Sequence, residues 1–174
     1  MRRGGPATGR HPIVGKRRGM GDELEPTRAF EEAARRRADL HHALVDVERA
    51  ISSPATGRLD TWTDDVVKRL SILLDSIDEH IEVTERPEGL YEEILDRAPR
   101  LSSQVDRLRA EHPALRTATA DLVERLHSTI IGRDWPLDEA RDDAQRLLGK
   151  IVKHRQRGAD LVWEAYNLDI GGIE

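Results

Sequence analysis

Hydrophobic side chains recur three and four residues apart along four long segments of the chain, which is the spacing of one face of an α-helix. In the second of these segments, the apolar stripe runs through Val66, Leu70, Leu73 and Ile77. No segment shows the strict alternation of a β-strand, and no hairpin turn signal is present. The pattern therefore predicts an all-α protein built from four amphipathic helices.

Capping and helix-breaking residues set the expected limits of these helices. Thr27 is a candidate N-cap for the first helix, and Pro136 suits the first turn of the fourth. Pro113 falls inside the third helix and is expected to kink it, because proline removes one backbone hydrogen bond. In chain order, the helices are expected to begin after Pro26, near Asp60 or Thr61, around Leu101 and near Pro136; the first ends before Ser52, the second breaks at Arg86–Gly89, and a short helical turn spans Leu90 to Leu95.

Short connections between four amphipathic helices favour an up-down-up-down four-helix bundle, which we expect over residues 26–168. Residues 1–25 are expected to form a disordered basic tail, because the first twenty carry six Arg or Lys, no acidic residue and seven Gly or Pro. Residues 169–174 are expected to form a short C-terminal tail.

Charge and composition narrow the classes of function. The net charge is −5, and the +6 of residues 1–20 leaves −11 for the remainder. A body this acidic does not resemble a nucleic-acid-binding protein. Only the basic tail suits a nucleic-acid or membrane-surface arm; a solvated extension, or a true start at Met20, explains it more simply. The chain has no cysteine, no apolar run approaching the roughly 20 residues of a membrane span, and no secretory leader, so a cytoplasmic location is expected.

Histidines interrupt the apolar stripes of the predicted helices. His80, His112 and His154 each occupy a stripe position, and His41 lies at the edge of the buried arc of the first helix, whereas His42 should face water. Neutral imidazoles are costly to bury without partners. Two arrangements satisfy them: a metal ion held by side chains from facing helices, or a hydrogen-bonded histidine network without metal.

The segments that carry these histidines resemble the haemerythrin-like (HHE cation-binding) family over roughly residues 27–166. The resembling pieces are LHHAL, DEHIEVTE, LRAEHPAL and KHRQRGADL, with successive histidines 39, 32 and 42 residues apart. The resemblance implies a four-helix bundle with a non-haem di-iron centre that binds or senses dioxygen, nitric oxide or peroxide, or handles iron. Carried over by position, it implies metal ligands at His41, His80, Glu85, His112 and His154.

Three positions depart from the family pattern. Thr84 stands where a bridging carboxylate is expected, with Glu85 next; Arg116 replaces a histidine, and Ala159 replaces a second carboxylate, with Asp160 next. A π-bulge, or the helix end before Pro87, would let Glu85 turn inward. Arg116 would repel a metal ion and could instead pair with Glu85 or Asp160. An intact di-iron centre, a mononuclear metal site and a metal-free bundle all remain open.

The functions that follow are small-oxidant binding at non-haem iron or, as the alternative, a metal-free helical bundle that acts as an interaction or regulatory module. No Ser-His-Asp arrangement, phosphate-binding glycine loop or zinc-protease pattern occurs, so we expect no catalytic nucleophile. The oligomeric state cannot be read from these patterns.

Overall fold

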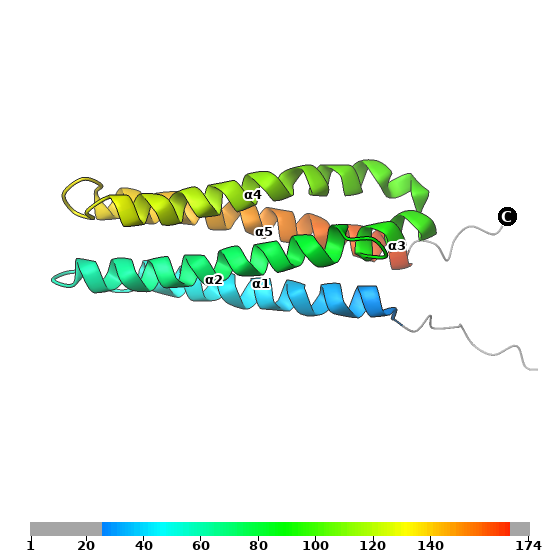
Figure 1. Ribbon diagram of the computed structural model, residues 1–174, viewed down its shortest axis with the longest axis horizontal. Coiled ribbons are helices and arrows are strands. Elements are labelled where there is room, and N and C mark those ends of the chain that lie inside the picture. The colour runs from blue at the N-terminus through cyan, green and yellow to red at the C-terminus, as the bar shows by residue number, and fades with distance from the viewer. Residues whose placement is uncertain (1–25, 168–174) are drawn as a thin grey trace, which may run out of the picture.

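Four long helices pack side by side in alternating directions and form an up-down-up-down bundle (Figure 1). The computed structural model describes residues 26–167. A short helix and a 3-10 turn cross one end of the bundle between the second and third long helices. The elements are α1 Arg28–Ser52, α2 Leu59–Glu85, α3 Leu90–Arg97, η1 Pro99–Leu101, α4 Ser102–Ser128 and α5 Leu137–Asn167. The predicted all-α fold class is confirmed.

The predicted helix limits hold to within a few residues. The Thr27 side chain accepts a hydrogen bond from the backbone N–H of Phe30 at 3.2 Å, which is the expected N-cap of α1. α5 begins at Leu137, and the carbonyl of Pro136 accepts the first hydrogen bond of that helix from Ala140. α4 remains helical through Pro113. The expectations for residues 1–25 and 169–174 lie outside the described residues.

The connection from α2 to α3 is a tight turn that only a glycine fits. Glu88 has a φ of 57°, and Gly89 follows it. A Cβ atom on Gly89 would lie 2.7 Å from the carbonyl oxygen of Arg86 and 2.9 Å from that of Val83, closer than real contacts allow. Since both neighbours are backbone atoms, they cannot move aside cheaply. The turn therefore fixes how α3 enters the bundle and where it carries Tyr91.

The core consists of two apolar clusters separated by a polar layer. The larger cluster includes Leu40, Leu73 and Ile151, and the smaller one includes Ala33 and Leu161. Between them, each long helix contributes one residue from its inward stripe. These residues are Arg37 from α1, His80 from α2, His112 from α4 and His154 from α5.

No helix among residues 26–167 is long and apolar enough to cross a membrane.

Removal of a core side chain should cost far more stability than removal of a surface side chain from the same helix. Leu70 of α2 is fully buried, whereas Ile72 is 44% exposed. We expect Leu70→Ala to lower the free energy of unfolding by about 3 kcal/mol or more, and Ile72→Ala by less than about 1 kcal/mol. Urea unfolding followed by circular dichroism measures both, and equal losses would contradict this assignment of the core.

Candidate metal centre

Three buried histidines from three different helices meet in the polar layer. His80, His112 and His154 are 7%, 1% and 2% exposed. One ring nitrogen from each can be chosen so that all three lie within 4.8 Å of one another. The ring centroids are 4.8 Å apart for His112 and His154, 5.3 Å for His80 and His112, and 5.5 Å for His80 and His154. The predicted convergence of imidazoles from separate helices is thus present in the fold.

Carboxylates hold the outer nitrogens of two of these rings. Nδ1 of His112 donates to Glu85, and Nδ1 of His154 donates to Glu111 at 2.8 Å. Glu111 also accepts from Arg157 at 2.7 Å. An ionised carboxylate accepts hydrogen bonds only, so both histidines must carry a proton on Nδ1. The Nε2 atom of each neutral ring is then left with its lone pair, which is the form that binds a metal ion.

The spacing of the inner nitrogens suits a shared ion. Nε2 of His80 lies 3.4 Å from Nε2 of His154. A tetrahedral ion with bonds of about 2.0–2.1 Å holds its nitrogen ligands roughly 3.3–3.4 Å apart. Since the whole set spans up to 4.8 Å, the wider separations would have to close by as much as about 1.4 Å around an ion. Nδ1 of His80 is buried and has no hydrogen-bond partner among the described residues.

Burial keeps the three rings neutral near pH 7. Desolvation, reinforced by the neighbouring His112 and His154, lowers the pKa of His80 from 6.5 to about 3. Burial also lowers the pKa of His112 and of His154, although Glu85 and Glu111 act in the opposite direction. Burial alone would raise the pKa of Glu111, but its hydrogen bonds with Arg157 and His154 outweigh this effect and leave the pKa lowered.

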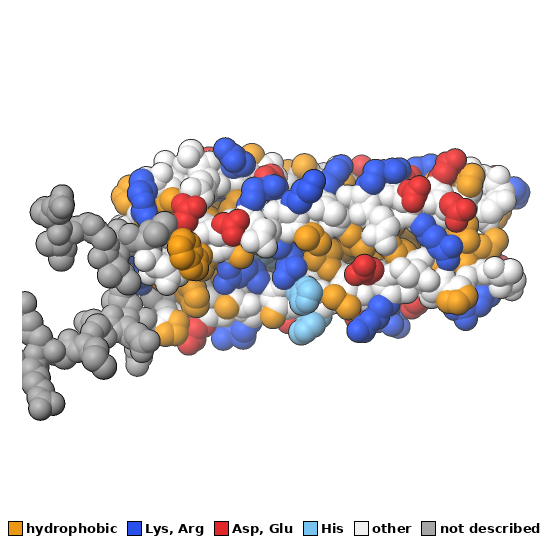
Figure 2. Space-filling view, turned by 180° about the vertical axis from the view of Figure 1, so that it is seen from behind, with side chains coloured by type: hydrophobic (Ala, Val, Ile, Leu, Met, Phe, Trp, Pro, Cys, Tyr) orange, Lys and Arg blue, Asp and Glu red, His pale blue; other side chains and the backbone are white. Residues whose placement is uncertain are grey.

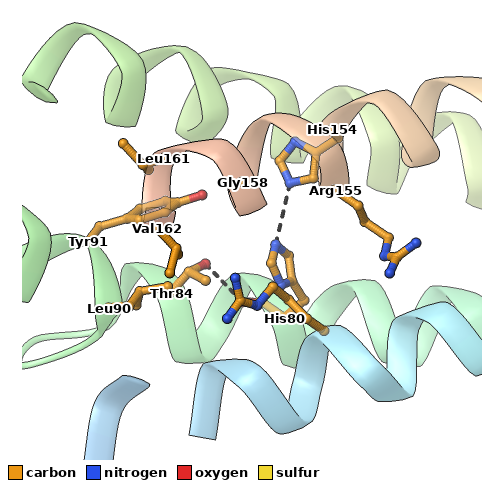
Figure 3. Close-up of a pocket in the computed structure, with 10 residues that line it drawn as sticks. His80, Thr84, Leu90, Tyr91, His154, Arg155, Gly158, Leu161 and Val162 are labelled. Carbon is orange, nitrogen blue, oxygen red and sulfur yellow. Dashed lines mark hydrogen bonds between the residues drawn. The ribbon is translucent and has the colours of Figure 1, made fainter. Parts of the chain in front are cut away.

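A small cavity opens beside the imidazoles (Figure 3). The space open to the centre of a water-sized sphere is about 20 Å³, which is room for one small ligand. The hydroxyl of Tyr91 lies 3.5 Å from Nε2 of His112, and burial raises the pKa of Tyr91, so the phenol stays protonated. The residues that line the cavity come from α1, α2, α3 and α5; they are Arg37, His80, Thr84, Leu90, Tyr91, His154, Arg155, Gly158, Leu161 and Val162.

The prediction that His41 faces the bundle axis is wrong. Its side chain is exposed, next to the equally exposed His42, and histidine side chains are visible on the face of the bundle formed by α1 and α5 (Figure 2). The inward stripe of α1 steps from Ala33 to Arg37 and then to Leu40, so the residue level with the three histidines is Arg37. His41 follows Leu40 directly and is turned about 100° away from that stripe.

Glu85 reaches the site, but it contacts the outer nitrogen of His112 instead of joining the inner group. It does so because it is the last residue of α2, where the helix ends before Pro87; α2 itself contains no π-bulge. Thr84 is buried and donates its hydroxyl hydrogen to the carbonyl of His80 at 2.8 Å. Where the family pattern has a bridging carboxylate, this chain therefore has a threonine that bonds to its own helix backbone, followed by a glutamate at the helix end.

The predicted pairing of Arg116 with Glu85 or Asp160 is wrong. Arg116 lies in solvent and binds both carboxylate oxygens of Asp78, at 2.7 and 3.3 Å. Asp160 is exposed and accepts a hydrogen bond from Gln156 on the same helix, at 2.9 Å. Arg116 is thus turned outward, and its charge is compensated away from the imidazoles.

Four further residues of the site were not assigned to it from the sequence. Glu111 precedes a stripe histidine, and Tyr91 lies in the short helical turn after a predicted break, so both were within reach of a helical-wheel argument. The position of Arg37 on the apolar stripe, between Ala33 and Leu40, would have predicted that its side chain faces the core. Arg155 carried no such signal, because only the packing of α5 against α1 brings it to the cavity.

No known family model matches the chain, and neither the curated proteins nor the solved structures compared with it give a match. The case for function therefore rests on the site geometry and on the residues that form it.

Acid should destabilise the metal-free fold. The three imidazoles are neutral in the folded chain but titrate near 6.5 when unfolded, so the unfolded state binds more protons below about pH 6.5. We expect the free energy of unfolding to fall as the pH drops from about 6.5 toward 4, with His80 alone contributing up to about 1.4 kcal/mol per pH unit. Urea unfolding across this range measures the slope.

Two variants serve as the matched pair for this measurement. His80→Leu should flatten the slope, whereas His41→Gln, at an exposed position, should leave it unchanged. A slope that His80→Leu does not reduce would show that the buried ring is not its source.

Proposed function

We propose that this chain is a metal-binding four-helix bundle of the haemerythrin-like type, in which His80, His112 and His154 hold one transition-metal ion beside a cavity for a small oxidant. The observation that carries the proposal is the convergence of three buried, neutral imidazoles with carboxylates on two of their outer nitrogens. Structural packing does not require such a set, because each imidazole is costly to bury. A shared ion satisfies all three at once.

The donor set favours a single ion over a pair. Three imidazole nitrogens suit iron, zinc, copper or nickel, and we infer non-haem iron from the family resemblance. The positions expected to supply bridging carboxylates hold Thr84, which bonds to the backbone, and Ala159, which is exposed. Three protein ligands beside an open cavity match metal sites that bind an exogenous molecule, whereas closed sites use four.

The residues around the ion have separate tasks in this proposal. Glu85 and Glu111 keep a proton on Nδ1 of His112 and His154, which orients each ring and raises its basicity as a ligand. Tyr91 keeps its phenolic proton and can donate it in a hydrogen bond to a molecule in the cavity. Leu90, Leu161 and Val162 line the remaining wall and exclude water. When bound, iron would supply reversible ligation of dioxygen, nitric oxide or peroxide.

A second function is supported by one feature of the same network. His112 and His154 already have carboxylate partners, and Tyr91 lies close to the remaining nitrogen of His112, so the layer can persist as a hydrogen-bonded network. The chain would then be a metal-free helical interaction module. This second function predicts a melting temperature that neither a chelator nor added iron changes, because only a ligand of the folded state shifts the unfolding equilibrium.

The decisive measurement is metal content after expression in iron-supplemented medium. We expect about one iron per chain, and an absorption change when nitric oxide is added to the reduced protein without oxygen. His154→Ala should abolish both, because it removes an inner nitrogen. His41→Ala removes an exposed imidazole and should retain both. Metal-free wild type, or equal loss in the two variants, would refute the proposal.

The carboxylate on an outer nitrogen should tune metal affinity. We expect Glu111→Gln to weaken binding by about ten- to a hundredfold, because the amide no longer fixes the proton on Nδ1 of His154 as an ionised carboxylate does. Glu79→Gln removes the same charge from a solvent-exposed pair with Arg36 and should change affinity little. Competition with a chelator of known affinity measures both variants, and equal affinities would argue against the role of Glu111.

A further inference from the structure

Two arginines face the same cavity as the imidazoles. Arg37 of α1 and Arg155 of α5 both line it, and none of the ten lining residues is acidic. They lie close enough for Arg155 to lower the pKa of Arg37, an effect second only to burial. The face of the bundle formed by α1 and α5 shows basic side chains in the seam between these helices (Figure 2).

Neither guanidinium is neutralised within the described part of the chain. Other arginines around the site have acidic partners: Arg36 pairs with Glu79 and Arg157 with Glu111. Arg37 and Arg155 form no ion pair or hydrogen bond with any residue from 26 to 167. The Nε–H of Arg155 is buried without an acceptor there. Guanidinium groups remain charged at any pH a protein tolerates, so this charge cannot be relieved by losing a proton.

Two like charges and a buried N–H donor at one small cavity need an acceptor that carries negative charge. We propose that the cavity binds a small monovalent oxyanion, of the carboxylate or nitrite type, between the guanidinium groups of Arg37 and Arg155. A planar guanidinium offers two parallel N–H donors, which match two oxygens of such an anion. The hydroxyl of Tyr91 lines the same cavity and can donate a further hydrogen bond.

Cavity size restricts the anion. About 20 Å³ is open to the centre of a water-sized sphere, so an occupant has only a few non-hydrogen atoms. This anion is held by the arginines and needs no metal ion, although the proposed metal ligands His80 and His154 line the same cavity. The inference therefore goes beyond the proposed function. It can be tested in protein stripped of metal, so a failure to bind the anion is distinguishable from a failure to bind the metal ion.

Formate is the probe, titrated into the full-length, chelator-treated chain by calorimetry in a buffer whose other anion is the bulky gluconate. We expect saturable binding at one site. Arg37→Gln and Arg155→Gln should each weaken it about ten- to a hundredfold, the effect of losing a charge-assisted hydrogen bond. Arg146→Gln removes a charge from an exposed position of α5 and should leave the affinity unchanged. Benzoate, which is too large for the cavity, should not bind.

A direct measurement covers the case in which a variant fails to fold. In the wild-type chain, formate should shift the ¹⁵N–¹H signal of the Arg155 Nε–H group and leave that of Arg146 in place. The proposal is overturned if formate does not saturate, if Arg146→Gln weakens binding as much as Arg155→Gln, if benzoate binds as well, or if the Arg155 signal does not move.

Discussion

The hydrogen bonds from His112 to Glu85 and from His154 to Glu111 are what allow a polar layer to cross the middle of this bundle. A buried polar group without a partner costs roughly 2–7 kcal/mol, and three imidazoles occupy this layer. Each carboxylate sits at the rim, where it is still partly hydrated, and reaches inward to one ring. Carboxylates at the surface therefore provide hydrogen-bond partners for the buried rings, and an apolar cluster packs on each side of the layer.

Backbone geometry at one end of α2 brings the remaining groups to this layer. The helix stops at Glu85, which frees that side chain from the helical register and lets it meet His112. The turn through Gly89 then starts α3 close against α2 and delivers Tyr91 beside the same ring. Two functional contacts thus depend on a single chain reversal, and a side chain at Gly89 would disturb both.

Periodicity in the sequence was sufficient for the bundle and for the three histidines, because a stripe position on a long helix faces the core whatever its residue type. The same rule explains why the prediction for His41 is wrong. In α1 the stripe position at this level is occupied by Arg37, and His41 lies one residue beyond the stripe residue Leu40. Pro87 marks the helix end that lets Glu85 reach the site, but Glu85 bonds to the outer nitrogen of His112 and does not join the three imidazoles as the predicted ligand. Arg155 and the outward turn of Arg116 depend on how the helices pack, which no single-helix pattern contains.

Gly158 forms part of the cavity wall, and a Cβ atom placed there would have no neighbour within 4 Å. Helix interiors rarely keep glycine, since alanine would be favoured by about 1 kcal/mol. Here the missing side chain leaves open space on the α5 side of the cavity. A larger side chain at this position would occupy that space, so the size of residue 158 limits the volume that the cavity offers to a bound molecule.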